Sequence, residues 1–160
     1  MKLLFDLDGT LTDPFVGITE SIRAALVGLG RPAPPAESLG WCIGPPLKAS
    51  LMHLLATEDE ALAEAALALY RKRFGVVGLF ENRVYPGIPE ALETLKIEGH
   101  TLYVATSKPK VFAARILEHF ALGPYFDAVY GSELDGTLSE KGDLIAHILS
   151  KEAVVATEAV

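Results

Sequence analysis

Two aspartates stand two residues apart near the start of the chain, in the sequence Asp6-Leu7-Asp8-Gly9-Thr10. Alternate residues of an extended segment share one face, so both carboxylates are expected at the same rim, with Leu7 turned away. One carboxylate can attack phosphorus and form an aspartyl phosphate, while the second protonates the leaving oxygen and then activates water. Carboxylate and carbonyl oxygens are also ligands that suit Mg²⁺. On its own, this pair is equally typical of an acidic turn that faces solvent.

Two later segments offer groups that hold anions. Thr106, Ser107 and Lys108 follow a β-rich run and precede a helical pattern, where a hydroxyl and free main-chain N–H groups can bind phosphate oxygens. Lys141 opens a later helical pattern and could balance the charge of Asp6 and a phosphate. By themselves, the first segment is typical of an ordinary helix N-cap and the second of a solvated surface lysine.

Strands must bring these residues together. An apolar run at 2–7 predicts a buried strand that leads into the two aspartates. Beyond residue 84, β-rich runs alternate with helical patterns, which predicts a parallel sheet with helices on its faces. The strands are expected at 101–106 and 126–131, and the helices at 86–99, 110–122 and 141–152. The last residues, 157–160, have the pattern of a further strand that begins there.

The segment 14–84 is helical in pattern and interrupts the β-rich part of the chain. Helices are expected at 15–30, 46–55 and 57–74. Thr57 and Glu60 have the spacing of a capping box at the start of the last of these helices. We therefore predict an all-helical insertion after the first strand.

The composition limits the classes of function. Half of the 160 residues are hydrophobic and 22% are charged, which provides a folded core and excludes a mainly disordered chain. The net charge of −7 argues against a nucleic-acid-binding surface. No apolar run reaches the roughly 20 residues of a membrane span, and the single cysteine, Cys42, excludes an intrachain disulfide. We expect a soluble, cytoplasmic protein without nucleic-acid or membrane partners.

The run FDLDGTLTD at 5–13 resembles the first motif of the haloacid dehalogenase-like hydrolases, in particular the branch that contains phosphoglycolate phosphatases. The resemblance implies that Asp6 is the nucleophile and Asp8 the general acid/base. An aspartate at the second position indicates phosphoryl chemistry rather than dehalogenation, because a leaving alkoxide needs a proton. The resemblance also implies that Thr106 is the hydroxyl of the second motif and Lys141 the lysine of the third. Further phosphate contacts would come from Gly9, Ser107 and Lys108.

The resemblance covers nearly the whole chain and implies an α/β fold. Its Rossmann-like parallel sheet core would comprise residues 1–13 and 85–160, and its inserted all-helical cap residues 14–84. Such a cap closes over the site and excludes water. The segment 41–48 resembles the cap loop that faces substrate, with Gly44 and Lys48 as candidate substrate ligands. The alternative interpretation of this segment is a rigid linker between two cap helices.

The family's fourth motif, a glycine with acidic residues after a later strand, has no counterpart before the chain ends at 157–160. In the family these acids complete the metal site. We expect the chain to be a fragment of a longer phosphatase, because its other catalytic residues are intact. A natural truncation is the alternative. On the fragment hypothesis, the 160-residue chain alone binds Mg²⁺ weakly and turns over little substrate.

The resemblance implies an enzyme, a Mg²⁺-dependent phosphoric monoester hydrolase. The metal would be held by the carboxylate of Asp6 and the main-chain carbonyl of Asp8. Its substrate would be a small phosphomonoester, either 2-phosphoglycolate or a nucleoside 5′-monophosphate; the stretches at 78–90, 105–109 and 134–137 resemble bacterial 5′-nucleotidase-like members. The alternatives are a phosphotransferase of the sugar-phosphate mutase type and a non-catalytic binding module. The sequence leaves a monomer and a homodimer equally open.

Overall fold

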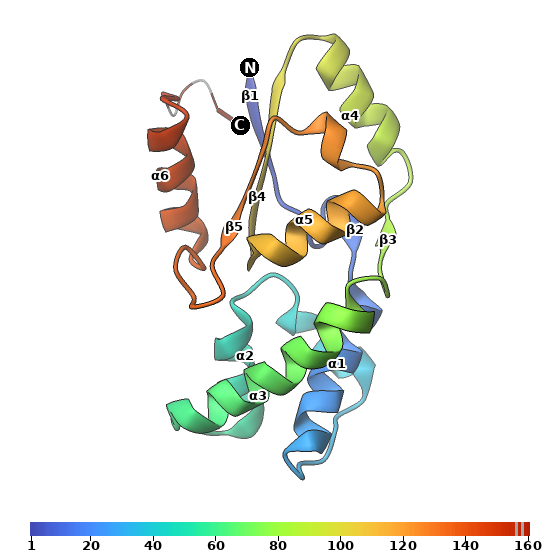
Figure 1. Cartoon of the computed structure of the whole chain (residues 1–160), viewed down its shortest axis with the longest axis vertical. Coiled ribbons are helices and arrows are strands. Elements are labelled where there is room, and N and C mark those ends of the chain that lie inside the picture. The colour runs from blue at the N-terminus through green and yellow to red at the C-terminus, as the bar shows by residue number, and fades with distance from the viewer. Residues whose placement is uncertain (156, 158) are drawn as a thin grey trace. The chain divides into compact units, whose positions relative to one another are not determined.

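The chain divides into two compact units in a computed structural model that describes residues 1–155, 157, 159 and 160 (Figure 1). The first unit combines Met1–Asp13 with Val84–Val160, and the second is Pro14–Arg83. Over the described residues, none of the helices has both the length and the apolar character needed to cross a membrane.

Three parallel strands form the sheet of the first unit, in the order β1–β4–β5. They are β1 (Lys2–Phe5), β4 (Thr101–Pro109) and β5 (Ala128–Ser132). Lys2 also bridges Ala159 in parallel orientation, and the N–H of Leu4 donates to the carbonyl of Val160 at 2.8 Å. Ala159 and Val160 thus run beside β1, whereas residue 158 of the expected final strand lies outside the described residues. Because the strands are parallel, their carboxyl ends meet at one edge.

Helices cover both faces of this sheet. Figure 1 shows α6 (Lys141–Lys151) on one face, and α4 (Ile88–Ile97) and α5 (Lys110–His119) on the other. The short 3₁₀-helix η3 (Gly123–Tyr125) follows α5. The core under α6 consists of buried side chains from two strands and the helix: Tyr103, Ala105, Tyr130, Leu144 and Ile148. The α/β class with a parallel sheet is confirmed.

The second unit is built from helices, with one close approach that explains two glycines. Its helices are α1 (Phe15–Gly28), η1 (Ala36–Cys42, a 3₁₀-helix), α2 (Leu47–Leu55), α3 (Glu60–Arg73) and η2 (Phe74–Gly78, a π-helix). A Cβ on Gly17 would lie 2.0 Å from the carbonyl oxygen of Gly78, so a side chain there would separate α1 from η2. Cys42 is buried in this unit. Two short strands, β2 (Thr12–Asp13) and β3 (Arg83–Val84), pair with each other.

The start of α3 differs from the expected capping box. The helix begins at Glu60, and the side chain of Asp59 accepts a hydrogen bond from the N–H of Ala61 at 2.9 Å. The hydroxyl of Thr57 instead accepts from the N–H of Asp59 at 3.0 Å. The capping-box prediction is therefore wrong, because a turn held by Thr57 places Asp59, rather than Thr57, at the N-cap.

Candidate active site

The two aspartates of the first motif lie in a tight loop directly after β1. The carbonyl of Leu7 accepts from the N–H of Leu11 at 2.9 Å, and both side chains are fully buried. Gly9 has a φ of +78°, a left-handed conformation that favours glycine. The buried leucines and the glycine turn therefore hold the loop in place. Asp6 and Asp8 lie in this loop at the carboxyl edge of the sheet.

Asp6 is held from two directions. Its Oδ1 accepts from the N–H of Leu7 at 2.8 Å, and its Oδ2 lies 3.0 Å from the Nζ of Lys141. Lys141, the first residue of α6, also donates to the carbonyl of Ala105 on β4 at 2.9 Å. The side chain of Asp6 is 35% exposed. A carboxylate with this orientation and exposure can be reached by a substrate.

The side chain of Asp8 is more buried than that of Asp6. Its Oδ2 is 2.9 Å from the Nζ of Lys108, and the two side chains are only 10% and 6% exposed. Its Oδ1 is buried and has no hydrogen-bond partner among the described residues. Because a buried polar atom without a partner costs free energy, this oxygen calls for a ligand or a functional explanation.

The end of β4 leaves the regular ladder just where Lys108 begins. The register with β5 is regular up to Thr106 and resumes at Pro109, which pairs with Ser132. The buried Thr106 hydroxyl accepts from the N–H of Lys108 at 3.2 Å. The hydroxyl of Ser132 donates to the carbonyl of Ser107 at 2.8 Å. Hydrogen bonds made by Thr106 and Ser132 hold this bulge on both sides, so the main chain at Lys108 has a defined position.

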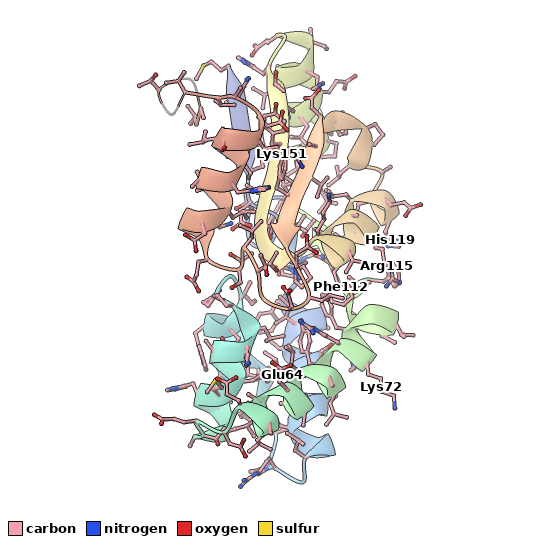
Figure 2. All side chains as sticks on the ribbon, turned by 60° about the vertical axis from the view of Figure 1, so that its left-hand side comes forward. Glu64, Lys72, Phe112, Arg115, His119 and Lys151 are labelled. Atoms are coloured by element: carbon pink, nitrogen blue, oxygen red, sulfur yellow. The ribbon has the colours of Figure 1, made fainter. Side chains whose placement is uncertain are left out.

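The remaining candidates, Gly44 and Lys48, belong to the second unit. Gly44 has a φ of +103° in the turn before α2. The ammonium of Lys48 pairs with the carboxylates of Glu60 and Glu64, and the carboxylate of Glu64, which is labelled in Figure 2, lies 2.8 Å away. The hydrogen bond to Glu60 is the largest cause that raises the pKa of Lys48, and the hydrogen bond to Glu64 is the next. Any anion that binds Lys48 must compete with two carboxylates.

The family model for haloacid dehalogenase-like hydrolases matches residues 3–159. The chain belongs to this family. Its membership confirms the resemblance drawn from the first motif and makes the protein a haloacid dehalogenase-like hydrolase.

The curated relatives of this chain include two phosphatases and a protein kinase. A 5′-nucleotidase of Pseudomonas aeruginosa is 55% identical over 155 residues, with 97% of this chain and 70% of that protein covered. Tyrosine-protein kinase PtkA of Mycobacterium tuberculosis is 38% identical, and a phosphoglycolate phosphatase of Pseudomonas syringae pv. tomato is 32% identical. They cover 93% and 82% of this chain, which spans half the length of each.

A solved structure supports the same fold. The structure of a predicted phosphatase from Clostridium acetobutylicum has a TM-score of 0.95 and 46% sequence identity, and the match covers 99% of this chain and 73% of that one. This chain therefore has the haloacid dehalogenase-like fold over nearly its whole length.

The oxygen donors near the first motif are of the type that Mg²⁺ takes in proteins. Within the described part of the chain, no group of three or more His, Cys, Asp or Glu side chains could hold a metal. Mg²⁺ is commonly bound through one or two carboxylates, with the remaining positions filled by substrate phosphate and water. The carboxylate of Asp6 and the main-chain carbonyl of Asp8 fit that smaller set.

Sequence reasoning found the charged residues and missed the residues that support them. Asp6, Asp8, Lys108 and Lys141 lie together in the first unit as two ion pairs. The support that Ser132 gives to the bulge through its hydrogen bond to Ser107 was not predicted. Its only signal was the small-residue sequence that ends β5, Gly131-Ser132.

Proposed function

We propose that this chain carries the catalytic centre of a Mg²⁺-dependent phosphatase that hydrolyses nucleoside 5′-monophosphates through an aspartyl phosphate. The observation that carries the proposal is the Asp6 carboxylate. It is oriented by the N–H of Leu7 and by Lys141, lies beside Asp8, and remains 35% exposed. A nucleophilic carboxylate needs this combination of fixed orientation and access.

The reaction has two steps. In the first, a carboxylate oxygen of Asp6 attacks phosphorus, the bond between phosphorus and the ester oxygen breaks, and Asp8 gives its proton to that oxygen. In the second, water attacks the phosphorus of the aspartyl phosphate and gives a proton to Asp8, while the bond between phosphorus and the Asp6 oxygen breaks. This step releases phosphate and restores the Asp6 carboxylate. Lys141 balances the negative charge of Asp6 and the phosphoryl group during both steps.

Other groups at this edge complete the phosphate site. The Asp6 carboxylate and the Asp8 carbonyl would hold Mg²⁺, which neutralises charge on the phosphoryl oxygens when bound. Thr106, Gly9 and Ser107 are the further candidates for phosphate contacts. Gly44 and Lys48, which belong to the second unit, stay predicted substrate ligands on the family resemblance alone.

The choice of substrate rests on similarity. The 55% identity to a 5′-nucleotidase favours a nucleoside 5′-monophosphate over 2-phosphoglycolate, since the phosphoglycolate phosphatase is 32% identical. A sugar-phosphate mutase would use the same nucleophile, so the products must be identified.

The test is phosphate release with Mg²⁺ by protein expressed from the whole gene, after its intact mass has been measured. The substrates are nucleoside 5′-monophosphates, 2-phosphoglycolate and hexose phosphates. We expect Asp6→Asn to lower release by about 10³-fold or more, because the nucleophile is lost. The matched control is Asp135→Asn, because Asp135 is exposed and lies in a second Leu-Asp-Gly-Thr-Leu sequence at 134–138. Release that survives in Asp6→Asn would contradict the proposal.

A further inference from the structure

The site contains two lysines with different environments. The Nζ of Lys141 lies 3.0 Å from Asp6, and its side chain is 39% exposed. The Nζ of Lys108 lies 2.9 Å from Asp8 Oδ2, and its side chain is only 6% exposed. Lys141 can therefore meet an incoming phosphate, whereas Lys108 is enclosed with its carboxylate partner.

The two oxygens of Asp8 are also not equivalent. Oδ2 accepts the ion pair from Lys108, while Oδ1 is buried and has no partner among the described residues. Because an unpartnered buried oxygen is costly, its retention beside the nucleophile indicates that it is reserved for a group that arrives with the substrate.

The backbone around Lys108 is built to keep this arrangement. Thr106 and Ser132 hold the bulge from either side. A Cβ on Gly131 would lie 2.6 Å from the carbonyl oxygen of Lys108 and 2.8 Å from the nitrogen of Lys110. Only glycine at 131 lets β5 approach this closely, so the position of Lys108 is set by two strands.

We propose that Lys108 is a positioning residue that acts through Asp8, and not a phosphate ligand. Its ammonium fixes Oδ2, which leaves Oδ1 as the oxygen that passes the proton. This inference rests on the proposed function. In the first step the proton moves from Asp8 Oδ1 to the ester oxygen as the bond to phosphorus breaks; in the second, a proton from water returns to Oδ1. Lys108 keeps its own protons throughout.

Leaving-group dependence separates the two roles of Lys108. An alkyl ester such as adenosine 5′-monophosphate needs a proton on its leaving oxygen, whereas p-nitrophenyl phosphate has a weakly basic leaving group and does not. Since kcat/KM reports the first phosphoryl transfer, Lys108→Met should lower it by about 10²-fold for the alkyl ester and by less than about 5-fold for the aryl ester. Asp8→Asn should show the same pattern.

A second readout follows the later step. If water activation by Asp8 is also impaired, Lys108→Met should release a burst of p-nitrophenolate, up to one equivalent per enzyme, before a slow steady state. Lys108→Arg should restore part of the alkyl-ester activity. The matched control, Lys110→Met, removes the same charge from an exposed side chain two residues away and should leave both substrates unaffected.

Lys108→Met alone leaves the buried Asp8 carboxylate without its partner and could fail to fold for that reason. The double variant Asp8→Asn/Lys108→Met removes both charges and covers this case. Its kcat/KM should equal that of Asp8→Asn for both esters. Equal losses for both esters in Lys108→Met, or a further loss in the double variant, would overturn this inference while the phosphatase proposal stands. Wild-type protein without Asp6-dependent release would overturn the phosphatase proposal, and this inference with it.

Discussion

Gly131 shows at the level of a single residue how tightly the second motif is built. Its missing side chain allows the carbonyl oxygen of Lys108 and the nitrogen of Lys110 to approach β5. Gly131→Ala should therefore lower the free energy of unfolding by about 1–3 kcal/mol, because backbone atoms cannot move aside cheaply. Urea unfolding measures this change.

The matched control for that substitution is Gly142→Ala. A Cβ on Gly142 would have no atom within 4 Å, and the residue lies in the first turn of α6. Alanine is the better helix former, so this variant should be as stable as the wild type or more stable by up to about 1 kcal/mol. If Gly131→Ala is equally harmless, the close packing of β5 on the bulge is not required.

Single residues were predictable where their chemistry was distinctive. Two aspartates at alternate positions after an apolar run predicted Asp6 and Asp8 at one sheet edge, and the structure places both directly after β1. The pairing of Lys108 with Asp8 was not predicted, because it joins residues 100 positions apart through a bulge. Spacing along the sequence does not show where a strand leaves its ladder.

The start of α3 allows a test of one element. Asp59 accepts from the N–H of Ala61 and satisfies one of the donors that a helix leaves open at its N-terminus. Asp59→Ala should lower the free energy of unfolding by about 1 kcal/mol, and Asp59→Asn, which keeps an acceptor, should lower it by much less. Urea unfolding followed by circular dichroism measures both. Equal losses would show that the charge, and not the cap, matters.

Elements with regular periodicity were predicted well, and irregular ones were not. The helices expected at 110–122 and 141–152 correspond to α5 (Lys110–His119) and α6 (Lys141–Lys151). The 3₁₀-helix η1 and the π-helix η2 were missed, because short segments of these types have no apolar period. The close approach of Gly17 to Gly78 explains why η2 ends in a glycine, and this requirement comes from packing, which the sequence pattern does not show.

On the scale of the whole molecule, one polar cluster joins the parts of the first unit. The phenol groups of Tyr103 on β4 and Tyr130 on β5 both donate to the carboxylate of Glu152, which follows α6. The Nζ of Lys2 on β1 donates to the main-chain carbonyl of Glu152 at 3.3 Å. The ammonium of Lys151, labelled in Figure 2, lies 5.2 Å from the centre of the Tyr130 ring. Side chains from three strands therefore meet at one residue, Glu152, directly after α6: two at its carboxylate and one at its main-chain carbonyl.

Because of this cluster, we expect the free energy of unfolding to fall as the pH rises through the alkaline range. Burial, followed by the hydrogen bond to Glu152, raises the pKa of Tyr130 from 10.0 to about 12. The folded protein then binds the phenol proton more tightly than the unfolded chain, so this stabilisation is complete below pH about 10 and is lost as the pH rises to about 12. Burial and Glu152 also raise the pKa of Tyr103, which acts in the same direction.

Urea unfolding at a series of alkaline pH values, with phenolate absorbance recorded in parallel, tests this dependence. The wild-type protein should lose unfolding free energy over that interval, and Tyr130→Phe should lose less, because phenylalanine has no proton to release. Glu152→Gln should lower the pKa of Tyr130 but leave it above 10, since burial is the larger cause. Glu118→Gln, on the exposed side of α5, is the matched control and should change neither curve. A wild-type curve that is parallel to that of Tyr130→Phe would show that Tyr130 ionises as freely in the folded protein as in the unfolded chain.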